Sequence, residues 1–145
     1  MERFVDAQDP VIDRVMKELA RGRKDTHWMW FVFPQVAGLG QSETSRRYAI
    51  RSLKEARAYL AHPVLGERMR RCTRTLLETA ATTAEEVFGS VDARKLRSSM
   101  TLFHRADPGE DLFRQVLDRW FMGQPDEATD RFLELARSLP PDRQG

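Results

Sequence analysis

The stretch LFRQVLDRWFMG, residues 112–123, decides the fold class of this 145-residue chain. Its apolar residues recur at intervals of three and four, which places them on one side of an α-helix. Gly123 follows the last turn of this pattern and is typical of a helix end. The stretch therefore predicts an amphipathic helix, whose apolar side consists of Leu112, Phe113, Val116, Leu117, Trp120 and Phe121.

Residues before this stretch show the same kind of pattern. Asp9-Pro10 predicts a helix start, and Gly22 predicts the end of that helix after an apolar stripe over residues 11–19. A hydroxyl residue followed three positions later by glutamate is a capping box, which predicts two further helix starts. These pairs are Ser52 with Glu55 and Thr83 with Glu86. Pro63 and Gly89 predict breaks, and Asp92 predicts a cap for the helix that follows.

The last helix is predicted to begin near Pro125 and to end at Pro140-Pro141, so that residues 140–145 form a frayed tail. The chain shows no sustained strand alternation, no internal repeat and no long linker. The sequence therefore predicts an all-α fold, a single compact domain of about six or seven short helices over residues 1–145.

Composition and charge argue against several function classes. The chain carries 24 basic and 22 acidic residues, a formal charge of +2, which by itself does not indicate nucleic-acid binding. One basic stretch stands out, at Arg68, Arg70, Arg71 and Arg74, but Glu67 falls among these residues. A solvated helix face of mixed charge is the favoured interpretation; a nucleic-acid surface would predict steeply salt-dependent binding.

The chain is expected to be cytoplasmic and to avoid membranes. Its single cysteine, Cys72, allows no intrachain disulfide. The first residues do not resemble a signal peptide. The longest apolar run, residues 28–33, is far shorter than the ~20 residues that span a bilayer. No phosphate-binding glycine motif and no metal-ligand spacing of histidines are present, so no cofactor and no metal are predicted.

One stretch, HWMWFVFPQ at residues 27–35, is apolar on nearly every side. Taken alone it fits a buried strand, but a strand without a partner would leave its backbone groups unpaired. A short buried helix is favoured, capped by Asp25 or Thr26 and ended before Pro34. The glycines in GLG, residues 38–40, predict a loop that can approach a ligand closely.

These blocks resemble a known family. The segments THWMWFVFPQ at 26–35 and GLGQS at 38–42, then EARAYL at 55–60 and HPVLG at 62–66, are similar to its first two blocks. VFG at 87–89, Asp92 and KLRSSMTLF at 95–103 are similar to its third. The family is domain of unknown function 1810, sometimes labelled calpastatin-like. The resemblance extends over about residues 10–137, with departures at Thr26 and Val91, where serine and proline are expected.

The resemblance implies an all-helical, single-domain protein, and no biochemical function is established for the family. The calpastatin label carries no weight, because the chain lacks the disordered repeats of that inhibitor. Function must therefore be argued from the residues themselves.

The first candidate group is His27, Trp28, Trp30 and Gln35. A tryptophan ring can stack on a base or hold a cation, and its ring nitrogen donates one hydrogen bond. Gln35 can contact a polar edge, and His27 can act as an acid or base near neutral pH. The alternative is structural: both tryptophans pack in the core, the histidine has a structural partner and the glutamine fixes a loop.

The second candidate group is Lys95, Arg97, Ser98, Ser99 and Thr101. Hydroxyl residues between apolar ones are costly when buried without partners, by roughly 1–3 kcal/mol each. They either bond back to the preceding helical turn, which is the commoner fate, or line a polar pocket in which a cation meets an anion. A third, weaker candidate is Tyr48 with Arg46 and Arg47, which can meet a phosphate or carboxylate.

These groups suggest a pocket where the two segments meet. We hypothesise that this pocket binds a small polar or anionic metabolite, for example one with a nucleotide-like ring; whether catalysis follows stays open. The alternative is a structural or adaptor domain that binds another protein through a helix groove. The sequence does not indicate an oligomeric state.

Overall fold

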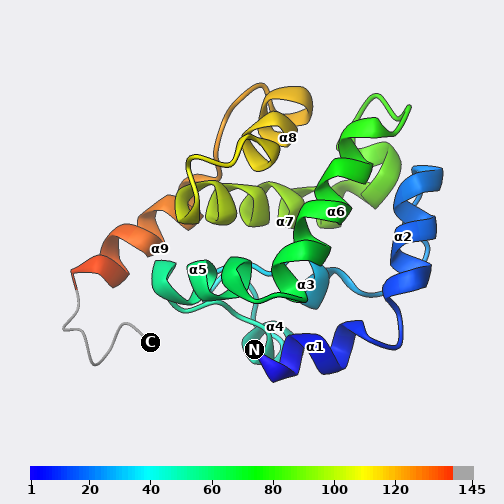
Figure 1. Ribbon diagram of the computed structural model, residues 1–145. Helices are drawn as coiled ribbons and strands as arrows, with labels where there is room; N and C mark the ends of the chain where they lie inside the picture. The colour runs from blue at the N-terminus through cyan, green and yellow to red at the C-terminus, as the bar shows by residue number, and fades with distance from the viewer. Residues whose placement is uncertain (139–145) are drawn as a thin grey trace.

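The computed structural model describes residues 1–138, and within them the chain forms nine α-helices and no strand (Figure 1). The all-α prediction is confirmed, but the count exceeds the predicted six or seven, chiefly because the short helices α1 and α4 were not anticipated. The predicted ending at residues 140–145 lies outside the described residues. The helices are α1 (Glu2–Gln8), α2 (Ile12–Arg21), α3 (Met29–Val32), α4 (Glu43–Arg47), α5 (Leu53–Ala61), α6 (Leu65–Glu78), α7 (Ala84–Ala106), α8 (Asp111–Phe121) and α9 (Glu127–Arg137).

The longest helix, α7, lies at the centre of the arrangement. It packs against α8 on one side and α5 on the other, and α9 contacts it as well (Figure 1). Helix α6 contacts α2, α5 and α8 and joins these layers together. The predicted stripe of α8 faces this core, where Phe113, Val116 and Leu117 are buried. One connected apolar core therefore holds all these helices in place.

Gly89 interrupts α7 near its beginning. Its φ of 77° and ψ of 169° are not helical, and a positive φ is strained for residues other than glycine. The predicted break at Gly89 is therefore confirmed. The cap predicted at Asp92 is wrong: the carboxylate of Asp92 forms ion pairs with Lys24 and Lys95 instead.

The predicted caps have mixed outcomes. Ser52 accepts the backbone N–H of Glu55 at 3.1 Å, as its capping box predicts, and Gly22 ends α2 in the left-handed conformation. The predicted cap at Asp9 is wrong, because α2 begins only at Ile12. Asp9 instead pairs with Arg68 at 2.8 Å.

The ambiguous stretch forms the short buried helix that is favoured over a strand. It contains the one-turn helix α3, which ends before Pro34 as predicted, but the cap expected from Asp25 or Thr26 is wrong. Beyond the helix, Val36 forms an isolated parallel bridge with Ile50. The backbone N–H of Ile50 donates to Gln35 at 2.8 Å, so the extended residues after α3 do find a partner.

Arg119 on α8 closes the end of α6. Its guanidinium donates hydrogen bonds to four backbone carbonyls at or just beyond the last turn of that helix, where no intrahelical donors remain. The distances run from 2.6 to 3.1 Å, and the carbonyls belong to Leu76, Leu77, Thr79 and Ala81. A side chain from a later helix therefore adds to the local C-terminal cap, in which the Thr79 N–H donates to the carbonyl of Leu76.

Candidate functional site

Glu18 on α2 organises the loop that leads into the candidate site. The residue is only 2% exposed, and its carboxylate accepts hydrogen bonds from the backbone N–H groups of Asp25 at 2.8 Å and Thr26 at 3.1 Å. It also accepts from the Thr26 hydroxyl at 2.6 Å and from the indole nitrogen of Trp28 at 3.0 Å. A single buried carboxylate thus satisfies four donors of one loop.

The same contacts keep Glu18 ionised. Burial raises its pKa, but the hydrogen bonds from Thr26, from the backbone of Asp25 and from Trp28 outweigh that effect and lower the pKa to about 2. At neutral pH the residue is therefore an anion held inside the protein.

Trp28 lies in the core. It is 1% exposed, and its ring packs against Phe33 and Phe88 with centroids 6.2 and 6.3 Å apart. With its nitrogen bound to Glu18, the indole presents no face to solvent in this conformation. Trp28 therefore packs in the core, as the structural alternative predicts for it.

Trp30 is placed differently. Its ring is half-buried, and the ammonium nitrogen of Lys95 lies 4.2 Å from the ring centroid, a cation–π geometry. The Lys95 ammonium also pairs with Asp92 at 3.2 Å, and Asp92 pairs with Lys24 at 2.8 Å. We call these four residues the Trp30 site: Lys24, Trp30, Asp92 and Lys95. The two predicted segments therefore meet here.

Charge at the Trp30 site is positive overall, because two lysines share one carboxylate. The side chain of Lys24 is only 6% exposed, and that of Lys95 is 21% exposed. Burial raises the pKa of Asp92, but the hydrogen bonds and charges of Lys24 and Lys95 outweigh it and hold that pKa below its usual value. Of the two cations, Lys95 is the one that an anion from solvent can reach.

The loop after α3 fits closely against the ring of Trp30. A Cβ atom at Gly40 would lie 2.8 Å from Cη2 of Trp30 and 2.6 Å from Cβ of Ser45. Real Cβ contacts are not this short, so only glycine allows the approach. The loop was predicted to approach a ligand closely, and in the structure it approaches the indole of Trp30.

Two further residues of the first group stand apart from each other. His27 is exposed on the loop before Trp28. Gln35 is 5% exposed, and within residues 1–138 its side-chain nitrogen has no hydrogen-bond partner. A buried amide without a partner is costly, and no protein group of the described chain explains it.

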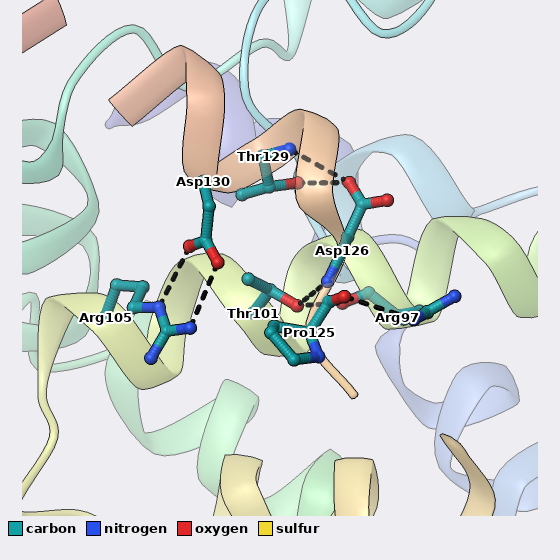
Figure 2. Close-up of polar contacts among 7 residues, drawn as sticks. All are labelled: Arg97, Thr101, Arg105, Pro125, Asp126, Thr129 and Asp130. Atoms are coloured by element: carbon teal, nitrogen blue, oxygen red, sulfur yellow. Dashed lines mark hydrogen bonds and ion pairs between the residues drawn. The ribbon is translucent and has the colours of Figure 1, made fainter. Parts of the chain in front are cut away.

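The second group divides along α7, and part of it fastens α9. Arg97 donates to the carbonyl oxygen of Gln124 at 3.0 Å. It also donates to that of Pro125 at 3.1 Å (Figure 2). Ser98 donates to the carboxylate of Asp126 at 3.0 Å. These contacts hold the loop that leads into α9.

One turn further along α7, the same kind of contact continues. Thr101 donates back to the preceding turn and accepts the backbone N–H of Asp126 at 2.9 Å, while Asp126 caps Thr129 at 3.1 Å (Figure 2). Arg105 forms a bidentate pair with Asp130 at 2.9 and 3.0 Å. We call this set the α9 clamp: Arg97, Ser98, Thr101 and Arg105 on α7 with Asp126, Thr129 and Asp130.

The hydroxyls of the second group therefore do bond back, the first of the two accounts. Ser98 reaches the carbonyl of Arg94 at 3.2 Å and Thr101 that of Arg97 at 2.8 Å. Ser99 differs: it is fully buried, and its hydroxyl has no hydrogen-bond partner within residues 1–138.

Sequence reasoning missed Lys24, Asp92 and Glu18. Asp92 was assigned to a cap, although its spacing of three from Lys95 is a signal for an ion pair along a helix. Lys24 and Glu18 gave no comparable signal, because their partners lie in other segments. Pairing charged residues at helical spacing would have found one of the three.

The weaker candidates have partners of their own. The ring of Tyr48 packs against those of Phe4 and Phe31, and the guanidinium of Arg47 lies 5.6 Å from its centroid. In the basic stretch of α6, Arg70 pairs with Glu110 at 3.2 Å, as Arg68 does with Asp9. The remaining two arginines of that stretch are exposed.

Residues 1–138 contain neither a metal-binding group nor a membrane-spanning helix. No group of three histidine, cysteine or carboxylate side chains in residues 1–138 is arranged to hold a metal ion. Within the same residues, no helix is both long and apolar enough to cross a bilayer.

Comparison with known proteins identifies the family. The family described as "Protein of unknown function (DUF1810)" matches residues 1–133. The chain belongs to this family. The match begins earlier than the predicted residue 10 and ends four residues before the predicted 137. A comparison with curated proteins finds no match.

A solved crystal structure of a similar protein has the same fold. The chain is 47% identical to the conserved hypothetical protein Rv1873 from Mycobacterium tuberculosis, whose crystal structure was solved at 1.38 Å. The similarity covers 92% of this chain and 95% of that one, with a TM-score of 0.90. The resemblance to the DUF1810 family is thereby confirmed, and neither comparison assigns an activity.

Proposed function

We propose that this DUF1810 protein binds a small anionic metabolite with a flat ring at the Trp30 site. The observation that carries the proposal is the ammonium of Lys95, 4.2 Å from the centroid of a half-buried indole. A flat ring can stack on tryptophan, and an anionic group on the same molecule can pair with the ammonium. Both partners come from the segments that the sequence singled out.

Electrostatics supports an anionic ligand over a cationic one. Lys24 and Lys95 share Asp92, so the site keeps one uncompensated positive charge. Lys24 is buried and stays with Asp92, whereas Lys95 is on a flexible four-carbon chain at the surface. An incoming phosphate or carboxylate can draw the Lys95 ammonium off the ring and free the indole face for stacking.

The remaining residues of the two segments have supporting positions in this proposal. The indole nitrogen of Trp28 donates to Glu18, and this contact positions the segment that carries His27 and Trp30. Arg97, Ser98 and Thr101 fasten α9 and contribute no direct contact. Direct binding is therefore assigned to Trp30 and Lys95.

A thermal-shift screen against nucleotides, sugar phosphates and aromatic carboxylates tests the proposal. A ligand at about 100 times its dissociation constant adds roughly 2.7 kcal/mol of stability. We expect a shift for one class in the wild type, its loss in Lys95→Ala and Trp30→Leu, and its retention in Arg94→Ala, which removes an exposed cation of the same helix. An equal shift in Lys95→Ala refutes the site, and no shift with any class favours the adaptor alternative.

A further inference from the structure

A groove of about 720 Å³ lies between the loop after α3 and the end of α9. One side is formed by the loop after α3 and by α4, and the other by the last two turns of α9. This volume is in the range of small-molecule sites. The residues that matter for its chemistry are Arg46, Arg51, Phe132, Leu135 and Ala136.

The α9 side of the groove is apolar. Phe132, Leu135 and Ala136 line it, and Leu135 is 69% exposed, so its apolar surface is open to solvent. A ligand that covers Leu135 and Phe132 would remove this apolar surface from water, at roughly 25 cal/mol per Å². The groove therefore favours an occupant with an apolar body.

The opposite side supplies only positive charge. Arg46 and Arg51 line it, and among residues 1–138 no aspartate or glutamate does. Two other grooves of similar size, about 640 and 690 Å³, also carry arginines, but each includes carboxylates. Those carboxylates are Asp130 and Glu134 in one groove and Asp126 and Glu127 in the other.

The two arginines keep their charge available. Arg46 donates one hydrogen bond to the carbonyl of Gln41 at 2.6 Å, which holds it along the loop. Within residues 1–138 neither Arg46 nor Arg51 forms an ion pair with a carboxylate. The nearest acidic group to Arg51 along the chain, Glu55, accepts the Arg51 backbone N–H and pairs with Arg3.

We propose that this groove binds a small amphipathic organic anion, whose apolar body lies on Phe132 and Leu135 and whose acidic head pairs with Arg46 and Arg51. The proposed contacts differ from those of the Trp30 site, since neither Trp30 nor Lys95 lines the groove; the two places adjoin at Gly40, which lines the groove and packs against Trp30. The groove also differs in chemistry, because it takes an apolar body in place of a flat polar ring. Arginine is well suited to the head group, because its planar fork matches a carboxylate or phosphate.

A titration of the ¹⁵N-labelled whole chain with decanoate, kept below its micelle concentration and followed in ¹H–¹⁵N correlation NMR spectra, tests this proposal. We expect chemical-shift changes at the amides of residues 37–51 and 132–138. Decanol, which has the same chain without the charge, should bind at least about tenfold more weakly. Arg51→Gln should weaken decanoate binding by about tenfold, while Arg94→Gln, an exposed arginine elsewhere, should leave it unchanged.

An apolar pair of variants tests the other half of the groove. Leu135→Ser and Met122→Ser each replace a highly exposed apolar side chain, 69% and 88% exposed, so neither should unfold the protein. We expect only Leu135→Ser to weaken decanoate binding. The proposal is overturned by shifts outside the groove, by equal binding of decanol and decanoate, or by equal effects of the two serine variants.

Discussion

The α9 clamp and the Trp30 site use neighbouring residues of one helix in opposite ways. In the clamp, the polar side chains of Arg97, Ser98 and Thr101 each contact the loop or cap of α9. At the Trp30 site, Lys95 lies on an indole that is half-buried, and it shares its carboxylate with Lys24. The clamp has a matched polar partner for each of these side chains within the fold, whereas two lysines share one carboxylate at the Trp30 site.

The difference lies in how fully the charges of each region are matched within the fold. Both regions have the same kinds of side chain, and the sequence placed them in one group. A polar group whose hydrogen bonds are satisfied within the fold contributes to stability, and its removal leaves other groups unpaired. A cation with a shared partner at the surface contributes little to stability and can bind a ligand.

The largest expected effect is on the loop that carries Trp30. Glu18→Ala leaves four buried or part-buried donors without their acceptor, so we expect a loss of about 3 to 5 kcal/mol in the free energy of unfolding. Denaturant unfolding measures this loss. Glu67→Ala, which removes an exposed glutamate, should stay within about 0.5 kcal/mol. Similar values for both variants would mean that the loop does not depend on Glu18.

A pH series tests the same residue without a large structural change. The pKa of Glu18 falls from 4.5 to about 2 on folding, so the ionised carboxylate stabilises the folded state fully above about pH 4.5. That contribution, about 3 kcal/mol, is lost as the pH falls towards 2. We expect denaturant unfolding of Glu18→Gln to show a correspondingly weaker loss over this range. The same acid sensitivity in both proteins would contradict this assignment.

The clamp should show a smaller loss. Asp126→Ala removes the cap of α9 and the acceptor of Ser98, and we expect about 1 to 2 kcal/mol of destabilisation in denaturant unfolding. Glu127→Ala, at the next position and exposed, serves as the control and should cost less. If both variants cost the same, the cap is not what holds α9.

Ser99 should change stability in the opposite direction. Its hydroxyl is fully buried without a partner in residues 1–138, so Ser99→Ala removes an unpaired polar group from the core. We expect the free energy of unfolding to rise by up to about 1 kcal/mol, measured against Ser98→Ala, which should lower it. A clear loss in Ser99→Ala would show that the hydroxyl has a partner in solution.

The smallest effect on stability is expected at the Trp30 site itself. Lys95→Ala removes a partly exposed ion pair and a cation–π contact, together worth less than about 1 kcal/mol. Denaturant unfolding should therefore barely change while ligand binding is lost. A loss above about 2 kcal/mol, the size of a lost helix cap, would group Lys95 with the clamp.

Local patterns predicted much of the fold and less of the site. The stripe of α8, the Ser52 cap and the break at Gly89 depend on residues close in sequence, so periodicity and capping rules find them. Helices α1 and α4 have seven and five residues, too short to show a clear period.

The site depends on contacts between distant segments. The sequence singled out Trp30 and Lys95 separately, but the shared carboxylate of Asp92 and the partner Lys24 become visible only when the chain is folded. Glu18 was missed for a similar reason, because a glutamate in an amphipathic helix is normally solvated. Its four donors come from a loop seven to ten residues further along the chain.

The guanidinium of Arg119 has a consequence for how the chain folds during synthesis. The carbonyl of Leu76 precedes its partner Arg119 by 43 residues, so the end of α6 leaves the ribosome long before its cap exists. Until α8 docks, water must satisfy those carbonyls, and the last turn of α6 is expected to fray. We therefore expect the core around α6 to close late, when the newly made α8 brings the guanidinium of Arg119 to these four carbonyl oxygens.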